Sequence, residues 1–181
     1  MQKILHVDDN LTLELPTLED AEDLFSLVDG NREYLREFLV WVDKTIAVEQ
    51  SAKNIQDRID GFVHETSASF IIKTGDKIIG SCGYVKIKKE HQYGEIGYWI
   101  SKDHEGKGII SKCVKALIEY GFKELQLHRI LIRCNSKNTR SSAIPKRFGF
   151  THEGTLREDH FDGIEYSNTE VFGLLNREYT L

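Results

Sequence analysis

The chain has 181 residues, of which 40% are hydrophobic and 29% are charged, and it contains two prolines. These values fit one globular domain over residues 1–181 and exclude a collagen-like or proline-rich protein. The formal net charge of −5 argues against a protein whose main role is to neutralise nucleic-acid phosphates.

Cysteine content and hydropathy predict the compartment. Cys82, Cys113 and Cys134 are far apart and form no C-x-x-C pair, so neither a disulfide framework nor a zinc knuckle is expected. The histidines show no spacing with acids or cysteines that requires a metal. The N-terminus loses its apolar character within a few residues, and no apolar run approaches the ~20 residues that span a bilayer. We therefore expect a cytoplasmic protein with no export signal, membrane contact or bound metal.

The first half of the chain is predicted to form a hairpin, several helical pieces and then a run of strands. Thr17 and Asp20 resemble a capping box that begins the first helix, and Asp29-Gly30 marks its end. Further helical pieces are expected where apolar residues recur three and four positions apart, and strands where they alternate. The expected ranges are 4–7 and 11–15 for the hairpin, 34–42 and 52–63 for the later helical pieces, and 68–73, 77–87 and 95–101 for an antiparallel meander.

In the second half of the chain, the spacing of apolar residues changes from strand-like to helix-like and back. Gly106-Lys107-Gly108 precedes a helix with one broad apolar face that runs from Ile109 to Phe122. A strand at 129–134 and a short helix at 138–148 follow, and a last hairpin is expected at 150–158 and 166–175. This order predicts an α+β fold, in which a mostly antiparallel central sheet contains a single β-α-β crossover and is flanked by helices.

The segment at 101–110, SKDHEGKGII, lies between a predicted strand and a predicted helix. Glycines allow a tight turn with open backbone N–H groups, which suits an anion such as a pyrophosphate. A glycine pair by itself more often makes only a strand-to-helix turn. A P-loop is excluded, because Ile109-Ile110 stand where it needs Lys and Ser/Thr. A dinucleotide-binding fingerprint is disfavoured, because Ser111 replaces its third glycine and an antiparallel meander precedes it.

Four segments together resemble one family. They are EIGYWI at 95–100, EGKGII at 105–110, NTRSSA at 138–143 and FGF at 148–150. The combination resembles the GNAT superfamily of acetyl-CoA-dependent N-acetyltransferases, and within it the RimJ/RimL type, including YdaF-like bacterial proteins. The resemblance covers nearly the whole chain, and the predicted order of elements matches the GNAT fold.

The resemblance implies an acetyl-CoA site at the glycine turn. The family's Q/R-x-x-G-x-G/A motif falls on 105–110, with Gly108 retained. Glu105 replaces Gln/Arg, and Ile110 replaces the small residue. The backbone cradle at 106–111 does not depend on these side chains. A carboxylate directed at a pyrophosphate is unfavourable, so we expect the Glu105 side chain to turn away.

The remaining cofactor contacts are also implied by the resemblance. The strand at 98–100 matches the segment whose backbone pairs with the pantetheine arm and offers an N–H to the thioester oxygen. Neighbouring strand side chains face opposite sides, so at least one of Tyr98 and Trp99 packs in the core. Asn138 is expected to cap the following helix. The implied cofactor-binding residues are Tyr98, Trp99, Ile100, Glu105, Gly106, Lys107, Gly108, Ile109, Ile110, Asn138 and Ser141.

The candidate catalytic residues follow from the same resemblance. Many relatives protonate the leaving thiolate with a tyrosine, but the corresponding position here is Pro145. Ser141 or Cys134 is the substitute that RimL-like relatives suggest, and Cys134 fits equally well as a small buried residue. Glu95 is the first candidate for the general base and His160 the second. For either residue, a solvated or structurally paired side chain is an equally good reading.

The leading hypothesis is an N-acetyltransferase that moves acetyl directly from acetyl-CoA to an amine, with a protein N-terminus, as in RimL-like relatives, as the first candidate acceptor. The acidic run at 8–29 is usually a solvated helix face, but it also suits a cationic acceptor such as a polyamine. The missing tyrosine and the two motif departures suggest a different class, a non-catalytic CoA-binding regulatory module. Trp41 and its apolar neighbours are a candidate surface for a homodimer.

Overall fold

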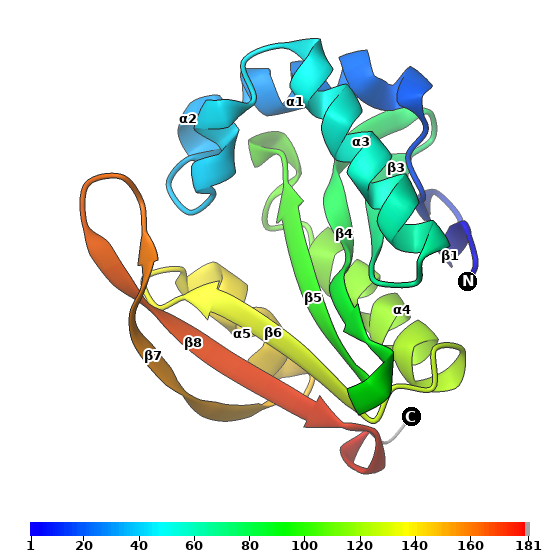
Figure 1. The fold of residues 1–181 in the computed structure, drawn as a ribbon, viewed down its shortest axis with the longest axis vertical. Coiled ribbons are helices and arrows are strands. Elements are labelled where there is room, and N and C mark those ends of the chain that lie inside the picture. Colours follow the sequence, from blue (N-terminus) through cyan, green and yellow to red (C-terminus); the bar gives the residue numbers. More distant parts are fainter. Residues whose placement is uncertain (180–181) are drawn as a thin grey trace.

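A computed structural model describes residues 1–179, in which eight strands form one mixed sheet flanked by helices (Figure 1). The strand order is β1-β2-β3-β4-β5-β6-β8-β7. Neighbouring strands are antiparallel except β5 and β6, which are parallel and are joined through α4. The strands are β1 (Ile4–Asp8), β2 (Leu11–Glu14), β3 (Ala68–Thr74), β4 (Lys77–Lys88), β5 (Tyr93–Ile100), β6 (Arg129–Asn135), β7 (Thr151–Phe161) and β8 (Tyr166–Leu175).

The helices lie near the positions that the sequence predicts, except that the expected piece at 34–42 is two short helices at 32–35 and 40–44. Thr17 and Asp20 form the expected capping box at a 3-10 turn that continues into the first α-helix. The α-helices are α1 (Ala21–Gly30), α2 (Arg32–Leu35), α3 (Val48–Val63), α4 (Ile109–Lys123) and α5 (Thr139–Arg147). The 3-10 helices are η1 (Leu18–Asp20), η2 (Val40–Lys44), η3 (Lys89–His91), η4 (Lys102–His104) and η5 (Asn176–Glu178). The predicted α+β class and the single parallel crossover are therefore confirmed.

Side chains on the central strands alternate between two cores on opposite faces of the sheet. On β3, Phe70 and Ile72 belong to the larger cluster, to which α4 contributes Leu117. Ile71, between them in sequence, belongs to a second cluster with α1 and α3. This period of two explains why α4 covers one face of the sheet while α1 and α3 pack on the other.

The pairing between β5 and β6 stops halfway along β5. The parallel register runs from Tyr93 opposite Arg129 to Ile96 opposite Ile132, and the two strands then diverge (Figure 1). Beyond Ile96, β5 stays paired with β4 on its other side. Val85 on β4 is an extra residue in the ladder at this point, and such a bulge bends a strand. The last four residues of β5 therefore have a free edge.

No helix within residues 1–179 is long and apolar enough to cross a membrane. Cys82, Cys113 and Cys134 are all buried free thiols.

Candidate functional site

A pocket of about 410 Å³ lies beside the free edge of β5. Four segments distant in sequence line it: the end of β5, the turn before α4, the start of α5 and the aromatic stretch that begins in α2. The sequence-predicted cofactor residues that it brings together are Tyr98, Trp99, Ile100, Glu105, Gly106, Gly108, Ile109, Ile110, Asn138 and Ser141. Lys107 is exposed and is not among the lining residues.

The glycine turn presents open backbone donors to this pocket. Gly106 and Gly108 have φ of +73° and +75°, a left-handed conformation that other residues adopt only with strain. Gly108 is the N-cap of α4, and the first bond into the helix runs from the Lys112 N–H to the Gly108 carbonyl, 3.1 Å. The N–H groups of the first helical turn therefore have no carbonyl ahead of them in the helix. Together with the helix dipole they suit an anion.

Buried polar contacts hold the turn in place. Ser101 is buried, its hydroxyl lies 2.8 Å from His104 Nδ1, and its N–H donates to the Ile79 carbonyl, 2.9 Å. The Lys102 N–H donates to Asn31 Oδ1 at the end of α1, 2.9 Å. The strand side of the turn is thus anchored before any ligand enters, which lowers the entropic cost of binding.

Cationic side chains surround the helix start. Arg147 of α5 donates from Nη1 to Ser111 Oγ, 2.5 Å, and it lines the pocket with Arg140 and His104. None of these three was predicted as a binding residue. His104 lies within the 101–110 segment, whereas the two arginines reach the turn only because α5 meets α4 in the folded chain. The Arg147 guanidinium adds positive charge beside the open N–H groups, which suits a pyrophosphate.

Glu105 does not turn away from the pocket, which corrects the expectation from the sequence. Glu105 is one of the lining residues, and its carboxylate forms an ion pair with Arg140 of α5, close to Tyr34, which also lines the pocket. The Arg140 guanidinium lies 5.9 Å from the centre of the Tyr34 ring. The physical reason is charge compensation. The positive charge of Arg140 offsets the negative charge of Glu105, which stands where the family motif has Gln or Arg.

Tyr98 and Trp99 point to opposite faces of β5. Tyr98 packs on the α4 side, and burial raises the pKa of its hydroxyl. Trp99 packs between the two smaller clusters, with its ring centre 6.0 Å from that of Trp41. Both side chains have packing roles, and their backbone lies on the free edge that can pair with a peptide-like ligand.

Ser141 lies where the cap of α5 meets Tyr98. Asn138 Oδ1 accepts from the Ser141 N–H, 2.9 Å, which confirms the predicted cap. Burial raises the pKa of the Cys134 thiol to about 11, and a hydrogen bond with Ser141 opposes that shift. A thiol with this pKa stays protonated near neutral pH, so it is a poor nucleophile. Pro145 occupies the buried side of α5 in place of a tyrosine.

The two candidate bases lie outside the pocket lining. Glu95 is half-buried on β5, paired in register with Lys86 and Leu131, and it precedes the point where β5 and β6 separate. His160 is on β7 opposite Ser167, and its Nε2 atom is buried without a hydrogen-bond partner among residues 1–179. No group of three metal-ligating side chains occurs in that part of the chain.

One wall of the pocket was missed by the sequence analysis. It is made of apolar side chains from α2 and the loop after it, namely Tyr34, Leu35, Phe38 and Leu39. The aromatic richness of this stretch was the available signal, but a buried helix face gives the same pattern.

A family model described as "Acetyltransferase (GNAT) domain" matches residues 10–151. This chain belongs to the GNAT acetyltransferase family. It is closely related to the RimL/YdaF-type ribosomal-protein acetyltransferases: YdaF of Bacillus subtilis (strain 168) is 32% identical over 177 residues, which cover 96% of this chain and 95% of YdaF. The ribosomal-protein-serine acetyltransferase of Escherichia coli (strain K12) is 27% identical over 172 residues, 95% of this chain and 96% of that protein.

Solved GNAT structures share the whole architecture. The microcin C7 self-immunity acetyltransferase MccE, solved with acetyl-CoA and AMP, superposes with a TM-score of 0.91 at 27% identity over 97% of each chain. RimL, an L7/L12 alpha-N-protein acetyltransferase solved with coenzyme A, gives 0.92 at 23% identity over 95% of this chain and 97% of RimL, a likeness of fold. The predicted GNAT fold and N-acetyltransferase family are therefore confirmed.

Proposed function

We propose that this chain binds acetyl-CoA along the pocket and transfers its acetyl group directly to a primary amine, with a protein N-terminus as the acceptor. The observation that carries the proposal is one pocket that joins the open N–H groups at the start of α4 to the free edge of β5. A pyrophosphate needs the first feature, and a pantetheine arm needs the second.

The proposed chemical step uses residues on both sides of the β5 edge. The amine nitrogen attacks the thioester carbonyl carbon, a C–N bond forms, and the C–S bond breaks. A backbone N–H on the free edge of β5 stabilises the oxygen while it carries charge. Ser141 gives its proton to the departing thiolate and regains one from solvent, and the proton of the amine passes through a water to Glu95, which then releases it to solvent. The products are an acetylated amine and CoA with a free thiol.

A protein N-terminus is the preferred acceptor for two reasons. Its pKa of about 7.7 to 8.0 leaves a useful neutral fraction near pH 7, so a weak base suffices. The acidic run at 8–29 attracts polyamines less strongly than its composition suggests. Asp8, Asp20 and Asp29 already form ion pairs with cations of this chain. A spermidine N(1)-acetyltransferase of Escherichia coli (strain K12) is 25% identical over 126 residues, so spermidine belongs in the test.

The test follows free thiol released from acetyl-CoA in the presence of each acceptor. The panel contains peptides that begin with Ser or Ala, the same peptides with a blocked N-terminus, and spermidine. We expect turnover with the free peptides and none with the blocked ones. Turnover with spermidine alone overturns the N-terminal assignment.

Binding is measured separately by thermal unfolding with acetyl-CoA, and with NAD as the control. A ligand at 100 times its Kd stabilises the fold by ~2.7 kcal/mol, which shifts the midpoint visibly. Stabilisation by acetyl-CoA without turnover on any amine identifies a CoA-binding regulatory module. No stabilisation by acetyl-CoA overturns the assignment of the pocket.

A further inference from the structure

A second pocket, of about 240 Å³, shares only Trp99 with the pocket at the glycine turn. Its walls are α1, η2, α3 and the Trp99 side of β5. Both tryptophans of the chain, Trp41 and Trp99, line it, and so does the guanidinium-bearing Arg58 of α3. The acetyl-transfer proposal uses nothing in this pocket except Trp99.

The pocket is positive on a chain whose net charge is −5. Its charged lining residues are Lys44, Lys53 and Arg58 against one carboxylate, Asp57. None of these four residues forms an ion pair within residues 1–179. The positive side chains are therefore uncompensated by the rest of the described chain, and a concave positive surface attracts anions.

Arg58 is the decisive residue, because it is half-buried and forms no ion pair within residues 1–179. Its Nη1 atom donates to Ser81 Oγ, 3.0 Å, and that hydroxyl donates onward to the Phe70 carbonyl, 2.7 Å. Burial lowers the pKa of Arg58 to about 10. A guanidinium has five N–H donors, and one acceptor satisfies only one of them. No unpartnered Arg58 nitrogen is buried within residues 1–179, so the remaining donors are open to solvent and can be reached by an anion in the pocket.

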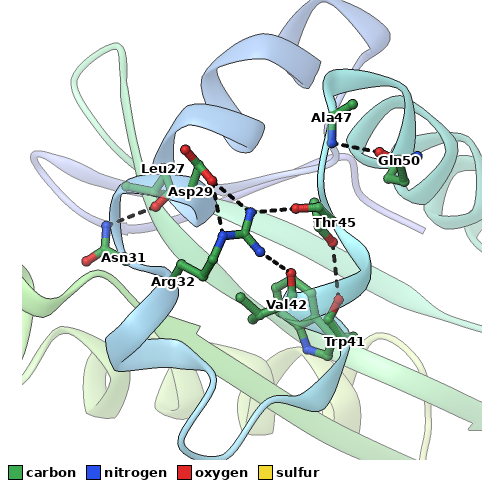
Figure 2. Close-up of polar contacts among 9 residues, drawn as sticks. All are labelled: Leu27, Asp29, Asn31, Arg32, Trp41, Val42, Thr45, Ala47 and Gln50. Atoms are coloured by element: carbon green, nitrogen blue, oxygen red, sulfur yellow. Dashed lines mark hydrogen bonds and ion pairs between the residues drawn. The ribbon is translucent and has the colours of Figure 1, made fainter.

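The wall opposite Arg58 is fixed in place before any ligand binds. Arg32 donates from Nη1 to the Val42 carbonyl, 2.5 Å, and from Nη2 to the Thr45 carbonyl, 2.6 Å, while Asp29 holds the same guanidinium at 2.8 Å (Figure 2). These bonds tie η2, which carries Trp41 and Lys44, to the end of α1. The backbone that carries Trp41 and Lys44 is thus held in place by hydrogen bonds, which reduces the ordering cost of binding.

We propose that this pocket binds a small anionic ligand, with a carboxylate or phosphate group on Arg58 and its remaining atoms against Trp41 and Trp99. Ser81 accepts from one N–H group of the Arg58 guanidinium. The remaining N–H groups can form two parallel hydrogen bonds to the anion. Lys44 and Lys53 add charge near the anion. The inference does not depend on the acetyl-transfer proposal, because a different set of polar groups carries it.

Tryptophan fluorescence tests the proposal directly, since the only two tryptophans of the chain both line the pocket. The protein is saturated with CoA, so that the glycine-turn pocket is filled, and is then titrated with phenyl phosphate, inorganic phosphate or benzoate at constant ionic strength. We expect a saturable change in emission. Binding of the phosphate probes alone assigns a phosphate ligand, and binding of benzoate alone assigns a carboxylate. No saturable change with any probe overturns the proposal.

Matched variants locate the binding site. Arg58→Met keeps the side-chain volume, and we expect it to weaken binding about tenfold or more, because a charge-assisted hydrogen bond is lost. Arg157→Met removes the same charge from an exposed position on β7 and leaves binding unchanged. Lys53→Gln, on the exposed face of α3, is expected to weaken binding a few-fold and does not depend on how the core tolerates a change at Arg58. Equal binding in all four proteins overturns the proposal, whatever the acetyl-transfer assay shows.

Discussion

The hydroxyl of Tyr98 and the residue Ser141 are joined by two hydrogen bonds across the opening between β5 and α5. Tyr98 donates to the Ser141 carbonyl, 2.9 Å, and the Ser141 hydroxyl donates to the Tyr98 oxygen, 3.2 Å. A strand of the sheet therefore sets the direction of the hydroxyl that the proposed reaction uses as a proton donor. Tyr98 of β5 thus contacts Ser141 directly, while Pro145 stands where the family resemblance implies a tyrosine in many relatives.

Tyr98→Phe removes this support without removing the ring. We expect a loss of about 1 kcal/mol in the free energy of unfolding, and a fall in kcat with KM for acetyl-CoA nearly unchanged, because Ser141 loses its orientation. Denaturant unfolding and steady-state kinetics measure the two effects. Tyr120→Phe is the control, since it removes a tyrosine hydroxyl whose one hydrogen-bond partner within residues 1–179 is the Gln2 N–H. Unchanged kcat in Tyr98→Phe contradicts the positioning role.

Ser141 and Cys134 are separated by their alanine variants. Ser141→Ala is expected to lower kcat by about two orders of magnitude, the typical contribution of a positioned proton donor. Cys134→Ala is expected to keep kcat and to lose about 1 kcal/mol of stability, because a small buried side chain is truncated. A large fall in kcat in Cys134→Ala with little change in Ser141→Ala assigns the proton donor to Cys134 and not to Ser141.

The glycine turn gives a prediction with an internal control. Gly108→Ala is expected to lower the free energy of unfolding by about 1 kcal/mol, because an alanine at φ +75° is strained. It is also expected to raise KM for acetyl-CoA, because the added methyl group enters the space beside the backbone N–H groups that bind the anion. Gly75→Ala, in the turn between β3 and β4 at φ +56°, has the same backbone cost far from the pocket. If both variants raise KM equally, the cradle is not the binding element.

The sequence was informative wherever a pattern is local. The periods of two and of three to four identified the strands and helices, and the turn at Gly106 to Gly108 was found from its neighbours. The free edge of β5 beside β6 was expected only from the family resemblance, which implies a strand that pairs with the pantetheine arm. No periodicity in the sequence predicts where a parallel pair of strands ends. Glu105 was misjudged for a similar reason. Its partner Arg140 is 35 positions away, and their meeting depends on how α5 packs.

The positive pocket at Arg58 lay beyond sequence reasoning altogether. Arg58 sits in an amphipathic helix, where an arginine normally reaches solvent. Its partial burial comes with the hydrogen bond to Ser81 on β4, and Arg32 separately holds the segment that carries Trp41 and Lys44. Each of these contacts links segments that share no motif, so only the folded chain shows an unpaired guanidinium.

The general base is tested through the pH profile of kcat. Glu95→Gln is expected to lower kcat about a hundredfold and to change its dependence on pH, because proton transfer from the amine then relies on solvent. His160→Asn is the matched comparison, and we expect it to retain most of the activity with the profile of the unmodified protein. A profile altered by His160→Asn and left intact by Glu95→Gln assigns the base to the unpartnered imidazole instead.

Burial of Cys134 predicts how stability depends on pH. Its pKa is raised from the ordinary value near 9.0 to about 11 in the folded protein. Below pH 9 both states keep the proton, and the stabilising effect of the neutral thiol is fully present. As the pH rises from 9 toward 11, the unfolded chain loses the proton first, and the free energy of unfolding falls by up to about 1.4 kcal/mol per pH unit from this group.

Denaturant unfolding of two variants tests this dependence. In Cys134→Ala, the free energy of unfolding should decline less steeply between pH 9 and 10.5. In Ser142→Ala, a change at a neighbouring position on α5, it should decline as in the unmodified protein. A decline equally steep in Cys134→Ala assigns the alkaline sensitivity to other groups, of which the buried thiols of Cys82 and Cys113 also have raised pKa values.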